Sequence, residues 1–169
     1  MIKNISGTEI KDSTGRPTLK IVISSDIHTV EVLVPSGQSR GSRETFELRD
    51  TDGGMKRALK ALENEIAPAL VGKKPEQKEI DGLLLSLDGT ANKSKLGGNT
   101  LIGVSLATAR LAAKESGEPL WRSIAAQSGR TPELPVLFMN IINGGVHADF
   151  RLPFQEYMIM IKRESARKS

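Results

Sequence analysis

The chain has 169 residues, of which 38% are hydrophobic and 26% are charged, a composition typical of an ordinary globular protein with a buried core. It contains no cysteine, which excludes disulfides and thiolate metal sites. No apolar run approaches the about 18 residues of a membrane span, and the N-terminal MIKNISGTEI lacks an apolar signal core, so we expect a cytoplasmic protein without a membrane partner.

The net charge of +4 raises the question of a nucleic-acid partner. Basic residues are interspersed with acidic ones through most of the chain, and only residues 162–169 are distinctly basic. This segment has no aromatic residue on which a base could stack. We therefore interpret it as a solvated basic tail and expect no nucleic-acid partner.

Residues 2–34 are expected to form a three-stranded antiparallel meander. Leu19, Ile21 and Ile23 occupy alternate positions, as in a strand with one buried face, and the pattern continues in Thr29–Val34. The turn Asp12–Pro17 separates the first two strands, with Gly15 available for positive φ.

Apolar residues then recur at helical spacing in four segments. We expect Asn99 to cap the third helix and an apolar side of the fourth to be buried. Helices covering one face of the meander give an α+β domain over residues 1–134, ending in the linker Gly129–Pro135. The expected helices are Met55–Leu70, Pro75–Leu87, Asn99–Lys114 and Pro119–Gln127, the buried side of the last being Leu120, Trp121, Ile124 and Ala125.

Two segments carry candidate chemistry. The loop Pro35–Ser42 contains glycines and hydroxyls but lacks the Gly-Lys-Ser/Thr ending of a phosphate-binding P-loop, so a plain surface connection is the simplest interpretation. Further along, the β-prone runs Val136–Ile142 and Tyr157–Ile161 flank a Gly-Gly turn and a group of polar residues at the strand ends. A hairpin with a solvated loop is the structural alternative to a functional site. The polar residues are His147, Asp149, Gln155 and Glu156.

Four stretches, in the same order, are similar to the enolase (phosphopyruvate hydratase) family. They are KDSTGRPTLKIVI from Lys11, VPSGQSRGSRETFELRD from Val34, LDGTANKSKLGGNTLIGVSLATAR from Leu87, and MNIINGGVHAD from Met139 with QEYMIM following. The resemblance implies an enolase-type N-terminal domain, a three-stranded antiparallel meander packed on helices. After it come the first two strands of a truncated β/α barrel over residues 135–161.

The resemblance also implies chemistry and residue roles. Enolases are magnesium-dependent lyases of glycolysis that dehydrate 2-phosphoglycerate to phosphoenolpyruvate. By matching position, Glu156 belongs to the carboxylate pair that helps the hydroxyl leave, and Gln155 lies beside it at the substrate. His147 lies on a loop that closes over the substrate, and Ser39 ligates the second Mg²⁺. The lysine base, the main metal carboxylates and the phosphate-binding arginine belong to the barrel, so we expect this chain to be inactive alone.

Several positions depart from the family pattern, which suggests a truncated or diverging copy. Three interpretations stay open: a component of an enolase-type lyase whose barrel is a separate chain, a non-catalytic binding protein, and a homodimer formed through open strand edges. The departures are Thr14 and Arg16 in the first turn, Gln38 and Arg40 in the loop Pro35–Ser42, which closes over the active site in enolases, Leu137 in place of the usual proline, Phe150 after His-Ala-Asp, a shorter loop after Asp50, and Ile161–Arg163.

Overall fold

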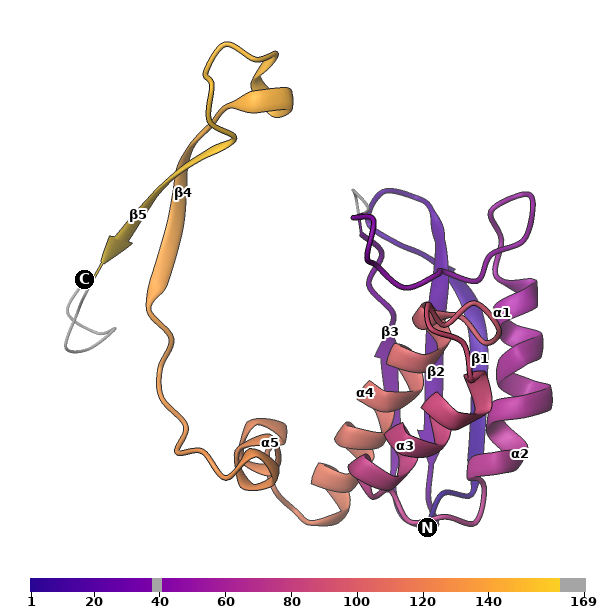
Figure 1. Ribbon diagram of the computed structural model, residues 1–169. Coiled ribbons are helices and arrows are strands. Elements are labelled where there is room, and N and C mark those ends of the chain that lie inside the picture. Colours follow the sequence, from indigo (N-terminus) through magenta and orange to yellow (C-terminus); the bar gives the residue numbers. More distant parts are fainter. Residues whose placement is uncertain (38–40, 162–169) are drawn as a thin grey trace. The chain divides into compact units, whose positions relative to one another are not determined.

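The computed structural model describes residues 1–37 and 41–161 and divides the chain into two compact units, Met1–Arg130 and Thr131–Ser169 (Figure 1). The basic tail at 162–169 lies outside the described residues. The first unit contains β1 (Asn4–Lys11), β2 (Pro17–Ser24), β3 (Thr29–Leu33), α1 (Lys56–Ala61), the π-helix η1 (Leu62–Ile66), α2 (Ala67–Leu70), α3 (Gln77–Asp88), α4 (Gly98–Glu115) and α5 (Leu120–Ser128). The second contains β4 (Leu137–Asn143), the 3₁₀ helix η2 (Gly145–Ala148) and β5 (Glu156–Ile161).

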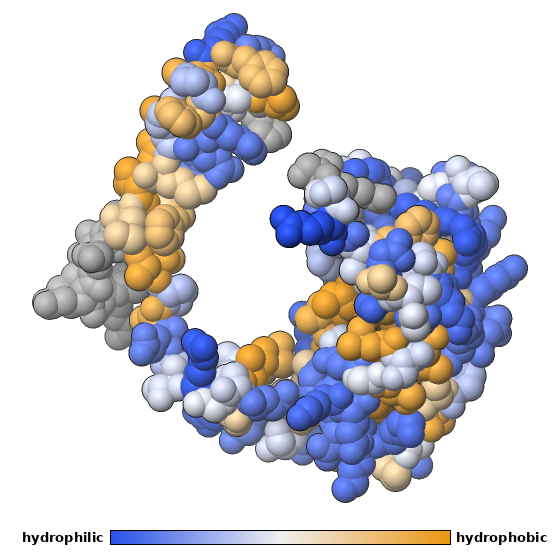
Figure 2. All heavy atoms as spheres, in the orientation of Figure 1, coloured by the Kyte–Doolittle hydropathy of each residue, from blue (hydrophilic) through white to orange (hydrophobic). Residues whose placement is uncertain are grey.

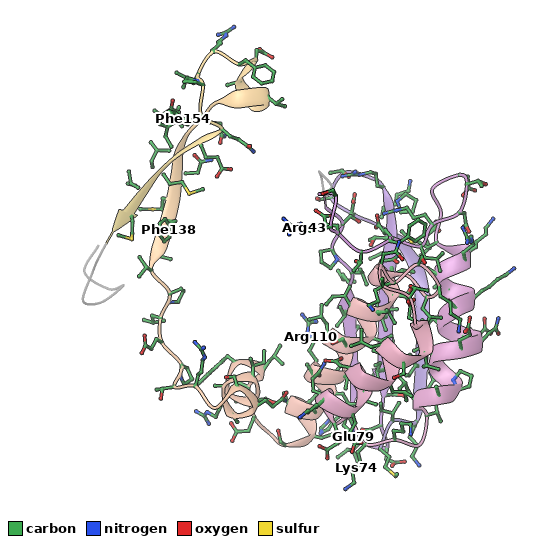
Figure 3. The ribbon with its side chains drawn as sticks, viewed as in Figure 1. Arg43, Lys74, Glu79, Arg110, Phe138 and Phe154 are labelled. Carbon is green, nitrogen blue, oxygen red and sulfur yellow. The ribbon has the colours of Figure 1, made fainter. Side chains whose placement is uncertain are left out.

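The first unit is built on a three-stranded antiparallel sheet in the order β1-β2-β3, which confirms the expected α+β class and meander. Leu19, Ile21 and Ile23 of β2 are fully buried, while the residues between them are partly exposed. The alternation read from the sequence therefore identifies the face that carries the core. On the open edge, Arg110 of α4 donates to the Glu31 carbonyl of β3 at 2.7 Å (Figure 3).

The helices from α1 to α4 gather on one face of this sheet (Figure 1). A Cβ added to Gly7 of β1 would lie 2.6 Å from Leu62, and one added to Gly103 of α4 would lie 2.8 Å from Ile21. Glycines on both sides therefore let helix and strand backbones approach closely. Within residues 1–37 and 41–161, no helix has the length and apolar character needed to cross a membrane.

The expected helix Met55–Leu70 is present, but it changes its winding along its length. It runs through α1, a five-residue π segment and α2, and the Ala67 N–H bonds to the Leu62 carbonyl, five residues back. Pro68 follows directly and has no N–H to give the next bond of an α-helical ladder. The wider turn lets the chain continue past this proline to Leu70 instead of breaking.

Two expectations about the later helices are wrong. Asn99 does not cap α4, because the helix begins at Gly98 and the Asn99 side chain bonds elsewhere. The apolar residues of α5 are not buried: Trp121 is 55% exposed and Ile124 52%. Periodicity correctly located the helix, but α5 lies beside the end of α4 rather than on the sheet, so no second layer covers its apolar side.

The second unit contains an antiparallel hairpin, in which β4 pairs with β5 around a bulge between Asn140 and Ile142. Every residue of β4 is exposed, and because Leu137, Phe138 and Met139 are consecutive, apolar side chains occur on both faces of the ribbon. Figure 2 shows orange spheres along the face turned to the viewer. Runs that are apolar on both faces are typical of strands covered on both sides, as in a parallel barrel. Taken by itself, this unit has apolar faces with no core between them.

The close contact at Gly103 leads to a matched pair of substitutions. We expect Gly103→Ala to lower the free energy of unfolding by about 1–2 kcal/mol, because its Cβ would meet Val34 and Ile21 in the core. We expect Gly82→Ala in α3 to raise it by about 0.5–1 kcal/mol, because nothing lies within 4 Å of an added Cβ and alanine favours the helix. Urea titration measures both. Equal effects of the two would contradict the close packing of α4 on the sheet.

Candidate functional site

The end of the β4–β5 hairpin carries three of the four predicted site residues. Glu156 begins β5 and pairs with Asn143, the last residue of β4. Gln155 precedes it, and its carbonyl accepts the Gly144 N–H at 2.8 Å. His147 lies in η2, within the loop that joins the two strands. The structure thus places these positions at one end of one hairpin. Ser39, the predicted metal ligand, lies outside the described residues.

The Gly-Gly turn is required by close packing of the loop on itself. A Cβ added at Gly144 would lie 2.0 Å from the Phe154 carbonyl oxygen and 2.9 Å from Leu152 Cβ, distances that no side chain tolerates. Gly145 has φ of +58° and accepts a 2.8 Å hydrogen bond from the Phe150 N–H. These glycines let the loop fold back and bring Gln155 and Glu156 to the end of β4.

The loop also contains two side-chain-bearing residues in the left-handed region, Asp149 with φ of +49° and Phe150 with φ of +56°. Aspartate tolerates this conformation, whereas a bulky phenylalanine is strained there by about 1–2 kcal/mol. The position at which the sequence departs from the family's asparagine is therefore one where asparagine suits the backbone better. Phe150 is also largely exposed, so burial does not offset this strain.

Gln155 and Glu156 both have exposed side chains. The aromatic rings of Phe154 and Tyr157 flank them and meet edge to face, with centroids 6.0 Å apart (Figure 3 labels Phe154). An exposed carboxylate and amide can reach a polar substrate. The hairpin end therefore presents a carboxylate that can accept a proton and an amide that can form hydrogen bonds, on a short segment flanked by two aromatic rings in contact.

In the first unit, the stretch LDGTANKSKLGG forms a loop organised by the buried carboxylate of Asp88. One oxygen accepts hydrogen bonds from the Thr90 N–H and hydroxyl, and the other accepts the Leu96 N–H at 2.7 Å. Burial raises the pKa of Asp88, but these hydrogen bonds, with the nearby Lys93 charge, outweigh it and hold the pKa below its ordinary value. Sequence reasoning treated this aspartate only as a helix end. The structural role of Asp88 is indicated by its carboxylate being both charged and buried.

Asn99 is a second residue with a structural role that the sequence did not reveal. Its side-chain oxygen accepts the Leu48 N–H at 2.9 Å, and its amide donates to the Leu48 carbonyl at 3.2 Å. The same extended segment bonds to the start of α4, where the Gly98 N–H meets the Phe46 carbonyl at 2.7 Å. Residues 46–48 are therefore fixed to the N-terminus of α4.

A pocket of about 520 Å³ lies between residues 35–37 and 44–47, α3 and the first turns of α4. Leu84, Leu101 and Ile102 provide apolar walls, and Glu44 and Asp81 provide carboxylates. Both carboxylates already accept hydrogen bonds, Glu44 from the Gly41 N–H and Asp81 from the Gln77 amide. Each of these two carboxylates in the pocket lining therefore already makes a hydrogen bond within the protein.

The described residues do not fit a magnesium site. Within 1–37 and 41–161, no group of three or more histidine, aspartate and glutamate side chains is placed to hold a metal ion. Mg²⁺ is bound by carboxylates together with substrate phosphates and retained waters, and one serine hydroxyl does not replace them. This chain's described part supplies no such carboxylate set.

Comparison with known proteins follows the two units. Residues 2–124 match the family model for the enolase N-terminal domain, and residues 131–168 match the model for the enolase C-terminal TIM barrel domain. This chain belongs to the enolase family. It is 51% identical over 166 residues to the enolase of a Nitratiruptor species, an alignment that covers 94% of this chain and 39% of that protein.

Family membership explains the two different kinds of unit. The first is the enolase N-terminal domain, with its sheet, helices and core. The second matches the enolase TIM barrel domain over a short stretch at its start, and such barrels enclose their strands on both sides. The apolar residues on both faces of β4 and β5 are consistent with strands of such a barrel.

Proposed function

We propose that this chain provides the N-terminal domain and the first two barrel strands of an enolase-type lyase that dehydrates 2-phosphoglycerate to phosphoenolpyruvate. The observation that carries the proposal is the 51% identity to an enolase over 166 residues, which extends through both units. A cytoplasmic location and dimerisation through the family's usual surfaces belong to the same proposal.

In this proposal the hairpin end contacts the substrate. Glu156 is the catalytic residue, one of two carboxylates that help the hydroxyl leave, with Gln155 and His147 binding the substrate beside it. Their clustering at one end of the hairpin supports these roles. Ser39 is the proposed ligand of Mg²⁺, an ion that belongs to the proposal only together with carboxylates outside these 169 residues, because the described ones do not form its site.

The 169-residue chain alone is expected to form no phosphoenolpyruvate, since Glu156 cannot complete the reaction without the missing groups. Mixed with a polypeptide carrying the remaining barrel of the Nitratiruptor enolase, it is expected to gain activity. Glu156→Gln is expected to lower that activity by about 10²–10³-fold, in the range of a lost acid-base group. Absorbance of phosphoenolpyruvate measures the rate. Activity of the chain alone, or full activity of the mixed Glu156→Gln variant, would contradict the assignment.

A second candidate is a non-catalytic interaction protein, favoured by the apolar faces of the hairpin. A contiguous exposed apolar surface of this kind is typical of an interface. If the chain binds its own copy through these faces, light scattering coupled to size exclusion shows a dimer, and Phe138→Lys on β4 returns it to a monomer. A monomeric wild-type chain argues against self-association. If 2-phosphoglycerate and Mg²⁺ leave the melting temperature of the chain mixed with the remaining barrel polypeptide unchanged, this second candidate is favoured over the first.

A further inference from the structure

One dipeptide at the hairpin end has its own chemistry. Asn143 is the one asparagine of the 169-residue sequence that glycine follows; isoleucine, glutamate, lysine or threonine follows the others. An asparagine side-chain amide is an electrophile, and the next backbone nitrogen can attack it where the following residue has no side chain to hinder the approach. Glycine at 144 is imposed by packing, since an added Cβ would meet the Phe154 carbonyl oxygen at 2.0 Å.

The reaction needs only water. The Gly144 nitrogen attacks Cγ of Asn143 and forms a new C–N bond, the bond from Cγ to the side-chain nitrogen breaks, and ammonia leaves with the proton from the Gly144 N–H. The resulting succinimide ring then adds one water at either carbonyl and opens to aspartate or isoaspartate. No oxidant or reductant takes part, and the net change is hydrolysis of an amide to a carboxylate.

The folded hairpin opposes the first step. The Gly144 N–H, which must be lost for attack, donates to the Gln155 carbonyl at 2.8 Å. The Asn143 side-chain oxygen accepts a hydrogen bond from the Asn140 side-chain amide at 2.5 Å. This bond restricts rotation of the Asn143 side chain, whose Cγ is the atom to be attacked. Asn143 is itself paired with Glu156 in the strand ladder. Attack therefore requires this end of the hairpin to open.

We propose that Asn143 is a site of spontaneous deamidation whose rate is set by opening of the closed end of the β4–β5 hairpin. The product changes the candidate site directly. An aspartate at 143 places a carboxylate opposite Glu156 in the ladder, and like charges at paired positions weaken a strand pair. Isoaspartate adds a methylene to the backbone and interrupts the pairing itself. The inference stands on this geometry and does not depend on the proposed function.

The test incubates the full chain in mildly alkaline buffer with and without urea, followed by tryptic digestion. Fragment-ion masses locate the conversion within the peptide 131–151, and isoaspartyl methyltransferase labelling identifies the isoaspartate. We expect conversion at Asn143 and not at Asn140 of the same peptide. We expect it to be about tenfold slower in buffer than in urea, which corresponds to an opening free energy of about 1.4 kcal/mol.

Two variants separate opening from intrinsic reactivity. Tyr157→Ala removes the ring contact with Phe154 beside the closed end, so we expect faster conversion in buffer and an unchanged rate in urea. Asn143→Gln removes the conversion under both conditions. The proposal is overturned if Asn143 does not convert in urea while a short Ile-Asn-Gly-Gly peptide does. Equal rates in buffer and urea, or a Tyr157→Ala rate in buffer equal to wild type, overturn it as well.

Discussion

Replacing Gly97 by alanine is expected to lower the free energy of unfolding by about 3–4 kcal/mol, which combines left-handed strain with overpacking. Gly97 has φ of +86°, and an added Cβ would lie 2.4 Å from Leu48 Cβ and 3.1 Å from the Leu48 nitrogen. The second contact is to backbone, which cannot rotate away. Urea titration followed by far-ultraviolet circular dichroism measures the change.

The matched control is Gly117→Ala. Gly117 follows α4 with φ of +69°, but nothing lies within 4 Å of an added Cβ, so only the backbone strain of about 1 kcal/mol applies. The difference between the two variants isolates the close approach of the 45–48 segment to the start of α4. If Gly97→Ala loses no more stability than Gly117→Ala, this segment is not held against α4.

Asp88→Asn is the second substitution with a large expected effect. The variant keeps one acceptor oxygen but turns an NH₂ group toward an N–H whose hydrogen bond the wild-type carboxylate accepts, either the buried one of Leu96 or the part-buried one of Thr90. We expect unfolding free energy near neutral pH to fall by about 2 kcal/mol, the usual effect of an unsatisfied buried donor. Chemical denaturation of wild type and variant side by side measures it.

The pH dependence of this difference has a definite sign. Because folding lowers the pKa of Asp88, its ionised form contributes stability that is fully present above the unfolded pKa of about 3.9 and is lost as pH falls through the folded pKa. The difference in unfolding free energy between wild type and Asp88→Asn is therefore constant near neutral pH and becomes smaller below about pH 4. Asp12→Asn is the comparison: the hydrogen bond from the Thr14 hydroxyl also lowers the pKa of that carboxylate, but its side chain is only partly buried, so we expect a smaller difference in unfolding free energy with the same dependence on pH. A gap that widens in acid would contradict the role assigned to Asp88.

The sequence predicted the regular parts of the fold because local patterns determine them. Alternation in Leu19–Ile23 identified the buried face of β2, and helical spacing located α3 and α4 to within a few residues. It also located the two strands of the hairpin, because β-prone runs and a Gly-Gly turn are local signals.

What the sequence did not predict depends on contacts between distant residues. Asn99 has the residue type of a helix cap, yet it bonds to Leu48, which is 51 positions away, and its helix starts without it. Periodicity cannot say whether a partner exists for an apolar stripe, so α5 was expected to be buried and is not. For the site, the sequence supplied the residues but could not show that Gly144 is excluded from carrying a side chain by the Phe154 carbonyl.

The exposure of α5 determines what the tryptophan fluorescence of this protein can measure. Trp121 is the single tryptophan of the chain, and the Arg122 guanidinium lies over its ring, 5.1 Å from the centroid. Because folding leaves this indole in water, its fluorescence changes little on denaturation. A polypeptide that settles on α5 would instead shift the emission to shorter wavelength, so the same ring serves as an intrinsic optical sensor of docking at that helix.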